Sequence, residues 1–178
     1  FTNALEDQSL TVNPASAGFI PSKLWTNEPL TFGVLVCTFF QLKNNSNSRF
    51  PHKLYNAVKL SELGGKFPDL VGVRWMNDFV LRVDERPFAR LIGLKSVDGS
   101  LFHQQGNFPS HGFVEISQEE VQEICPDVDT KGIDFDNQRL IMHSTRQFVR
   151  DSTEESIEAC RWTVLKKSYP ELVAAPSI

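Results

Sequence analysis

The sequence predicts an α+β protein, a winged helix-turn-helix domain with an N-terminal arm and a mainly helical C-terminal extension. Three observations favour this fold class. Hydrophobic periods and turn residues between Ser48 and Ile116 follow the order helix, strand pair, two short helices and wing. The same stretch carries an excess of positive charge in an acidic chain. With 40% apolar residues, including 14 Phe, the 178 residues can bury the core of one domain plus an extension.

Changes in composition divide the chain at two points. Residues 1–29 hold scattered prolines and polar residues without a sustained period, which is typical of an extended arm. Residues 30–116 form the predicted winged-helix domain. Residues 117–178 form an acidic extension, with helices expected at 117–124 and from Asp151 to about Tyr169, and a strand or turn at 139–144. The apolar side chains of the arm, which can dock on a neighbour or on the domain, are Phe19, Ile20, Leu24 and Trp25.

The net charge of −4 is distributed unevenly. Residues 1–42 carry a net −2 and residues 117–178 a net −5. Residues 43–116 carry ten Lys and Arg against seven Asp and Glu, a net +3. A phosphate group responds to local charge, within a Debye length of roughly 8–10 Å. The predicted domain is thus the part of the chain whose charge suits a nucleic-acid partner.

Two helices are predicted at the start of the domain. Residues 30–43 keep helical spacing, although their β-branched residues also suit a strand. A second helix begins at Ser48-Arg49-Phe50-Pro51, where proline suits the first turn, and ends at Gly64-Gly65. Its apolar face holds Leu54, Ala57 and Val58. Its opposite face, predicted to be exposed, holds His52, Lys53, Asn56 and Lys59.

Alternating apolar residues predict a strand pair after this helix. Val71, Val73 and Trp75 form the first strand, and Phe79, Leu81 and Val83 follow the turn at Asn77-Asp78. A further helix, distinct from the recognition helix, is predicted from Asp84, a good N-cap, to Gly93. Residues 107–112 are rich in turn formers and return through residues 113–116, as a wing and its strand would.

Residues 98–106 allow two interpretations. Asp98 can cap a short recognition helix from Gly99 to Gln105, which Gly106 ends. Asp98-Gly99 between two apolar stretches is also a β-hairpin signal, and a hairpin would remove the recognition helix. Gln104-Gln105-Gly106 favours the helix, because it suits helix propagation followed by a stop.

A set of short motifs recurs in one known family. The motifs are Ser48-Arg49-Phe50-Pro51 with Lys53-Leu54, Gly72 with Trp75 and Asp78, Ile92-Gly93-Leu94-Lys95, and Gly112-Phe113. Together they resemble the initiator-binding domain of parabasalid (trichomonad) core-promoter-binding transcription factors, over about residues 30–116. A weaker likeness to the heat-shock-factor winged helix runs in the same order.

Both of these relatives are winged helices that bind duplex DNA. The resemblance therefore implies a nuclear transcription factor that binds double-stranded promoter DNA. The chain departs from the initiator-binding pattern in a shorter third helix and in Pro109 and His111, which stand where a Trp-rich and basic wing is expected. The recognised DNA element is therefore left open.

A recognition helix needs outward side chains that match the donors and acceptors on base edges. At about 100° per residue, Leu101 and Phe102 point into the core. Gln104 is the first candidate base reader because glutamine pairs bidentately with adenine. The predicted base-reading set is Ser100, His103, Gln104, Gln105 and Asn107. A solvated polar face would give the same pattern.

A second predicted set contacts the DNA backbone. The resemblance implies that Arg49, beside a polar turn, enters a minor groove or clamps a phosphate. The other candidates for the backbone or minor groove are His52, Lys53, Lys59, Lys95 and His111. Each of them is also explained as an ordinary solvated charge.

Motifs of catalysis and cofactor binding are absent from the sequence: there is no Gly-rich phosphate loop, HExxH, GxSxG or CxxC. Residues 127–132 open like an EF-hand, but Lys131 replaces an oxygen ligand and Gln138 stands where the bidentate Glu is needed. The three cysteines, Cys37, Cys125 and Cys160, lack metal-ligand spacing, which predicts reduced thiols. We therefore expect no enzyme activity, cofactor, metal, membrane or small-molecule substrate.

Two hypotheses of function follow. The first is sequence-specific binding of a core-promoter element, with the recognition helix at residues 99–105, the third helix of the winged-helix plan, in the major groove. In this hypothesis the acidic extension either packs on the domain or recruits transcription proteins. The second is a winged helix that serves protein–protein interaction in a transcription assembly without direct DNA binding.

Overall fold

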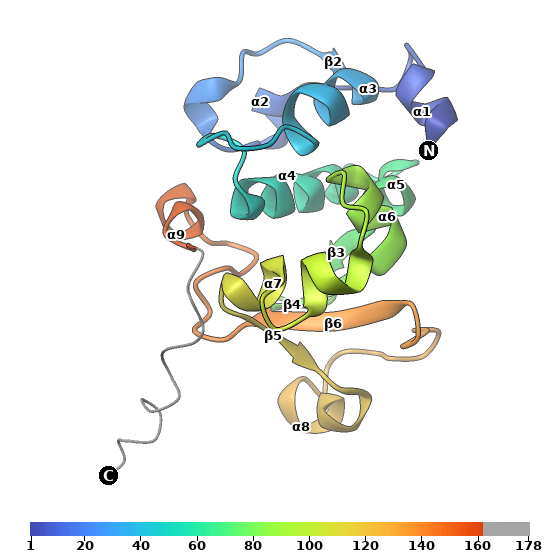
Figure 1. The fold of residues 1–178 in the computed structure, drawn as a ribbon, viewed down its shortest axis with the longest axis vertical. Coiled ribbons are helices and arrows are strands. Elements are labelled where there is room, and N and C mark those ends of the chain that lie inside the picture. Colours follow the sequence, from blue (N-terminus) through green and yellow to red (C-terminus); the bar gives the residue numbers. More distant parts are fainter. Residues whose placement is uncertain (162–178) are drawn as a thin grey trace.

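The computed structural model describes residues 1–161 (Figure 1). The continuation of the last predicted helix to about Tyr169 lies outside this range. The N-terminal layer consists of α1 (Thr2–Glu6), β1 (Thr11–Val12), α2 (Pro14–Ala17), η1 (Ser22–Leu24), β2 (Leu30–Thr31), α3 (Phe32–Leu35) and η2 (Val36–Phe40). The middle layer consists of α4 (Phe50–Glu62), α5 (Phe67–Val71) and α6 (Glu85–Leu91).

An antiparallel sheet lies below these helices in Figure 1. Its strands are β3 (Val73–Trp75), β4 (Val80–Asp84), β5 (Phe113–Ile116) and β6 (Gln138–His143), in the order β3-β4-β6-β5. The remaining elements are η3 (Asp98–Phe102), α7 (Asn107–Ser110), η4 (Gln118–Glu120), α8 (Val121–Ile124) and α9 (Glu154–Glu158).

The predicted arm docks on the domain through two buried residues, Phe19 and Ile20. The side chain of Asn56 on α4 accepts a hydrogen bond from the Ile20 main-chain N–H at 2.9 Å and donates one to its carbonyl oxygen at 2.8 Å. Leu24 stays exposed, and Trp25 packs partly buried against the core. The arm is thus less extended than predicted, because its own short helices fold it onto the domain.

The two helices predicted at the start of the domain are confirmed. Thr31 caps α3 by accepting a hydrogen bond from the Val34 N–H at 3.2 Å, and the chain continues as the π-helical turn η2. Helix α4 begins at Phe50 with Pro51 in its first turn. It ends before Gly64-Gly65, whose φ angles of +78° and +61° suit glycine.

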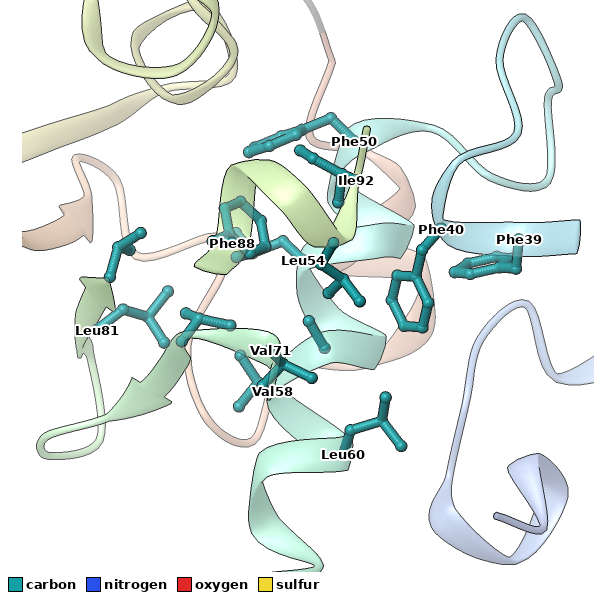
Figure 2. Close-up of a cluster of buried hydrophobic side chains, with 14 of the residues drawn as sticks. Phe39, Phe40, Phe50, Leu54, Val58, Leu60, Val71, Leu81, Phe88 and Ile92 are labelled. Atoms are coloured by element: carbon teal, nitrogen blue, oxygen red, sulfur yellow. The ribbon is translucent and has the colours of Figure 1, made fainter. Parts of the chain in front are cut away.

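The prediction of an exposed polar face on α4 is wrong for His52, Lys53 and Asn56, which are 1%, 9% and 0% exposed. The reason is that α4 lies between the N-terminal layer and the sheet, with α9 packed against it, so neighbours cover most of its circumference. Figure 2 shows the predicted core residues Leu54 and Val58 inside the buried cluster.

The strand pair β3–β4 is confirmed, with Trp75 opposite Leu81. Val71 instead ends helix α5, which the alternation did not predict. Gly72 turns the chain at φ +71° into β3, and a Cβ atom there would lie 2.8 Å from the Pro87 side chain. The helix predicted from Asp84 to Gly93 is α6, and Gly93 follows it at φ +77°.

Strand β6 lies between β4 and β5 and pairs with both, Ile141 with Leu81 and Leu140 with Ile116. One face of the sheet joins the main core, and the other packs against Val121 and Cys125 in and after α8. Within residues 117–161, η4 and α8 form where a helix was predicted at 117–124, and α9 covers only Glu154–Glu158 of the described part of the helix predicted from Asp151. The prediction of a strand or turn at 139–144 is confirmed as a strand.

The structure contradicts the hairpin interpretation of residues 98–106 and confirms the helical one only in part, because the helical turn ends at Phe102 rather than at Gln105. A π-helical turn covers Asp98–Phe102, and His103 is already extended, with ψ 160°. Gly106, also extended with ψ 175°, precedes α7, and a Cβ atom there would lie 2.7 Å from the Leu101 carbonyl oxygen, so the close approach of these segments needs glycine. Residues 107–110 form α7, and β5 follows as expected. The α+β class is confirmed, and the winged-helix assignment stays a prediction.

Candidate nucleic-acid interface

A cavity of about 550 Å³ opens between the loop before α4, the start of α4, the end of α6 and α7. We call it the basic cavity. Its described lining residues include four cationic side chains and no Asp or Glu: Lys43, Asn44, Asn45, Ser48, Arg49, Phe50, Lys53, Ile92, Leu94, Asn107, His111 and Arg161. Positive charge that no acidic neighbour balances in the lining makes this cavity suitable for an anionic ligand.

Arg49 stands at the start of α4 and binds the segment that contains α9. Its guanidinium group donates hydrogen bonds to the main-chain carbonyl oxygens of Glu158 at 2.9 Å and Cys160 at 3.3 Å. Burial lowers the pKa of this guanidinium, and repulsion by Arg161 lowers it further. Arg49 therefore lines the basic cavity while fastening α9 to α4.

His52 faces α9 and lies outside the cavity lining. Its Nδ1 accepts a hydrogen bond from the Arg49 main-chain N–H at 3.1 Å, so the proton is on Nε2, which lies 3.2 Å from a Glu158 carboxylate oxygen. Burial lowers the pKa of His52 and favours the neutral ring. His52, which the sequence predicted to contact the DNA backbone, thus has a structural role between α4 and α9.

Lys53 lies in the wall of the cavity. Its ammonium group donates a hydrogen bond to the Leu42 carbonyl oxygen at 2.6 Å. Burial, together with repulsion by Lys43, lowers the pKa of Lys53 to about 8. Lys53 is therefore a partly neutralised cation at slightly alkaline pH.

Asn107 and His111 form the opposite wall. The Asn107 side chain donates to the Ser100 carbonyl oxygen at 3.1 Å, and His111 Nδ1 donates to the Asn107 carbonyl oxygen at 2.7 Å. Burial lowers the pKa of His111, whose ring packs on Phe50 with centroids 5.1 Å apart. These bonds join α7 to η3, and the turn at residues 103–105 connects the two elements.

This turn presents His103, Gln104 and Gln105 to solvent. Arg139 on β6 holds η3, which precedes this turn: its guanidinium pairs with Asp98 at 3.3 Å and lies 4.4 Å from the centre of the Phe102 ring. The same guanidinium also pairs with Glu85 at 2.6 Å and with Glu115 at 3.0 Å. A single arginine therefore connects α6, η3, β5 and β6 beneath the exposed turn.

The structure brings most of the predicted site residues together. Four of them line the basic cavity, namely Arg49, Lys53, Asn107 and His111. Ser100 is hydrogen-bonded to Asn107, and residues 103–105 lie on the adjoining turn. Exposed Lys95 directly follows Leu94 of the lining.

Lys59 does not join this group, because it pairs with Glu62 at 3.8 Å and lies over the Tyr55 ring, away from the cavity lining. Sequence reasoning also missed Lys43 and Arg161. Lys43 directly precedes the polar turn before α4, and this position beside Arg49 could have marked it as a candidate contact from the sequence. Arg161 stands in an acidic segment, so local composition gave no indication of it.

Within residues 1–161, no group of three or more His, Cys, Asp and Glu side chains is arranged to hold a metal ion. No helix in that range is both long enough and apolar enough to span a membrane. The three cysteines are unpaired, with Cys37 exposed and the other two buried.

Comparison with protein-family models matches residues 24–147 to the transcription-initiator DNA-binding domain IBD. No curated protein and no solved structure matches the chain. The matched range extends beyond the predicted domain at both ends and includes β6. The match covers most of the chain, and it agrees with the resemblance that the short motifs indicate. The protein therefore belongs to the transcription-initiator DNA-binding domain family, a family of DNA-binding domains rather than of enzymes.

Proposed function

We propose that this chain acts in the nucleus as a transcription factor that binds a core-promoter element in duplex DNA. The observation that carries the proposal is the basic cavity, whose described lining holds four cations and no acid. Phosphate contacts of this kind give affinity and position the protein, whereas contacts with base edges give specificity.

The exposed turn at residues 103–105 is the proposed base-reading element. It adjoins the cavity along the chain, because Asn107 of the lining follows Gln105 by two residues, so one face can contact the DNA backbone and the bases together. The side chains of Gln104 and Gln105 are free of hydrogen bonds within the described residues, and a glutamine amide matches the N6 and N7 groups of adenine. In this proposal the turn takes the place of the recognition helix that the sequence predicted.

The acidic surface after β5 is proposed to contact transcription proteins. Glu119, Glu120 and Glu123 are exposed on η4 and α8, on the far side of the sheet from α4. Like charge keeps this surface away from DNA, so it stays open to a protein partner when DNA is bound.

Fluorescence anisotropy with labelled duplexes, repeated over a range of salt concentrations, tests the proposal. Lys43→Gln and Lys95→Gln should each weaken binding to all duplexes and reduce the salt slope by about one. Gln104→Ala should relax base preference and leave the salt slope unchanged. Lys23→Gln is the matched control, since this exposed lysine lies outside the cavity lining.

A selection of bound duplexes from a random pool would identify the recognised bases. If the chain is folded, as checked by circular dichroism, and binds no duplex even at low salt, the proposal that it binds DNA is wrong. The second hypothesis, a protein-interaction module without DNA contact, predicts that outcome.

A further inference from the structure

Like charges face one another across the basic cavity. Lys43 lowers the pKa of Lys53 by repulsion, and Arg161 has the same effect on Arg49. Arg49 in turn lowers the pKa of His111. All five residues line the cavity, and its described lining contains no carboxylate; Glu158, outside the lining, offsets part of the repulsion on Arg49. A bound anion would relieve several repulsions at once.

An unpartnered hydroxyl group lies at the same place. Ser48 lines the cavity and is 4% exposed, and its side-chain oxygen has no hydrogen-bond partner among the described residues. A buried polar group without a partner is unfavourable, because it has lost its hydrogen bonds to water. A serine hydroxyl reorients by rotation about a single side-chain bond, so an acceptor in the cavity can satisfy it.

Lys53 supplies a second buried donor. Its side chain is 9% exposed, and its one hydrogen bond within the described residues goes to the Leu42 carbonyl oxygen. An ammonium group has three N–H donors, so donors remain for a ligand. Buried donors with spare capacity beside unbalanced cations point to a ligand that is rich in acceptor oxygens.

We propose that the basic cavity is a discrete binding site for one phosphate group, held by Ser48 and Lys53 from the body of the domain and by Arg161 from beyond the family-matched range. The proposal rests on the proposed function where the phosphate belongs to the DNA backbone. The same chemistry also fits inorganic phosphate or a phosphorylated small molecule.

Phosphate suits the cavity better than a carboxylate does. A phosphate offers more acceptor oxygens, and guanidinium groups bind them in a bidentate geometry that ammonium groups cannot form. Arg49 directs one N–H of each terminal nitrogen to the Cys160 and Glu158 carbonyl oxygens, whereas the Arg161 side chain makes no hydrogen bond within the described residues and has its whole guanidinium fork available to a ligand. The bonds made by Arg49 hold the segment that carries Arg161 beside the cavity, so Arg49 acts as a positioning residue.

Titration of the ¹⁵N-labelled full chain with inorganic phosphate, followed by amide chemical shifts at constant ionic strength, tests this site. Saturable shifts are expected at Asn45, Ser48 and Lys53. Arg161→Gln and Ser48→Ala should each weaken phosphate binding about three- to tenfold, the loss expected for one hydrogen bond to a charged group.

Matched controls separate the site from general charge effects. Arg86→Gln removes an exposed arginine outside the cavity lining, and Ser46→Ala removes an exposed hydroxyl from the same loop as Ser48. Neither control should change phosphate affinity. Ser48→Ala should leave the melting temperature unchanged or raised, because the hydroxyl makes no bond within the described residues.

Competition with duplex DNA identifies the source of the phosphate. If phosphate displaces DNA more strongly than sodium chloride does at equal ionic strength, the site binds a phosphate of the DNA backbone. Unchanged DNA binding alongside saturable phosphate shifts supports a free phosphate ligand. Absence of saturable shifts, or equal effects of Arg161→Gln and Arg86→Gln, overturns the site. Duplex binding measured on the same samples then shows separately whether the proposed function stands.

Discussion

The guanidinium group of Arg49 donates a hydrogen bond to the main-chain carbonyl oxygen of Glu158 across 2.9 Å, joining the start of α4 to the end of α9. The same residue belongs to the motif on which the family resemblance depends, whereas Glu158 lies beyond the family-matched range. An arginine expected to contact DNA is therefore also a fastening point for the C-terminal segment.

Arg49→Ala should lower the free energy of unfolding by about 1–3 kcal/mol, because two carbonyl oxygens lose a charged donor. Arg49→Lys should recover only part of this loss. A lysine keeps the positive charge, but its ammonium group cannot match the fork of a guanidinium at two separate carbonyl oxygens. Urea unfolding measures both effects. An Arg49→Ala variant with the same free energy of unfolding as the native chain would show that the contact with α9 does not stabilise the fold.

Lys53 should make stability depend on pH in the alkaline range. Its pKa is about 8 in the folded chain against an ordinary value of 10.5, so between these values the unfolded chain binds more protons. The free energy of unfolding of the native chain, relative to Lys53→Met, should therefore rise from pH 8 to pH 10.5, by on the order of 3 kcal/mol.

Urea unfolding of both chains at pH 7 and at pH 10 measures this difference. Other titrating groups are common to the two chains and cancel. A constant difference between the two pH values would mean that the Lys53 ammonium group is better solvated than its burial indicates.

Gly72→Ala should destabilise the domain more than Gly64→Ala. Both glycines have positive φ angles, +71° and +78°, and therefore share the backbone strain of about 1 kcal/mol. A Cβ atom at Gly72 would also meet the Pro87 side chain at 2.8 Å and the Phe88 main-chain nitrogen at 2.9 Å, whereas Gly64 has open space. Thermal unfolding of the two variants isolates the steric part, and equal losses would contradict the close packing of α6 on this turn.

Arg139→Gln should weaken base preference more than overall DNA affinity. Its guanidinium anchors the turn at residues 98–105 through Asp98 and the Phe102 ring, yet it lies outside the basic cavity lining. Anisotropy with matched and mismatched duplexes measures the effect, with Arg74→Gln, an exposed arginine on β3, as the control. Equal base preference in both variants would show that the turn needs no support from β6.

Local patterns predicted the elements that local forces determine. The start of α4 at Phe50-Pro51, its end at Gly64-Gly65, and the strand pair around Asn77-Asp78 all follow from capping, turn chemistry and alternation. Burial of His52 and Asn56 was not predictable in this way, because α9 and the N-terminal layer cover α4 from distant parts of the sequence.

The candidate site was partly predictable for the same reason. Arg49, Lys53 and Asn107 belong to motifs and turns that the sequence displays, and the fold brings them to one cavity. Arg161 lies at that cavity beside Cys160, whose carbonyl oxygen is hydrogen-bonded to Arg49, and tertiary contacts of this kind cannot be read from local sequence. The π-helical turn at Asp98–Phe102 contacts Gly106 and Arg139, and such contacts leave no periodic signal in the sequence.

The position of β6 also sets an order for folding during synthesis. Because this strand lies between β4 and β5, a growing chain that has emerged only as far as Ile116 contains β5 without the strand it pairs with. The hydrogen-bonding edge of β4 stays open over the same interval. The sheet can close only after residues 138–143 leave the ribosome, so the edges of β4 and β5 that pair with β6 are open to other chains until then.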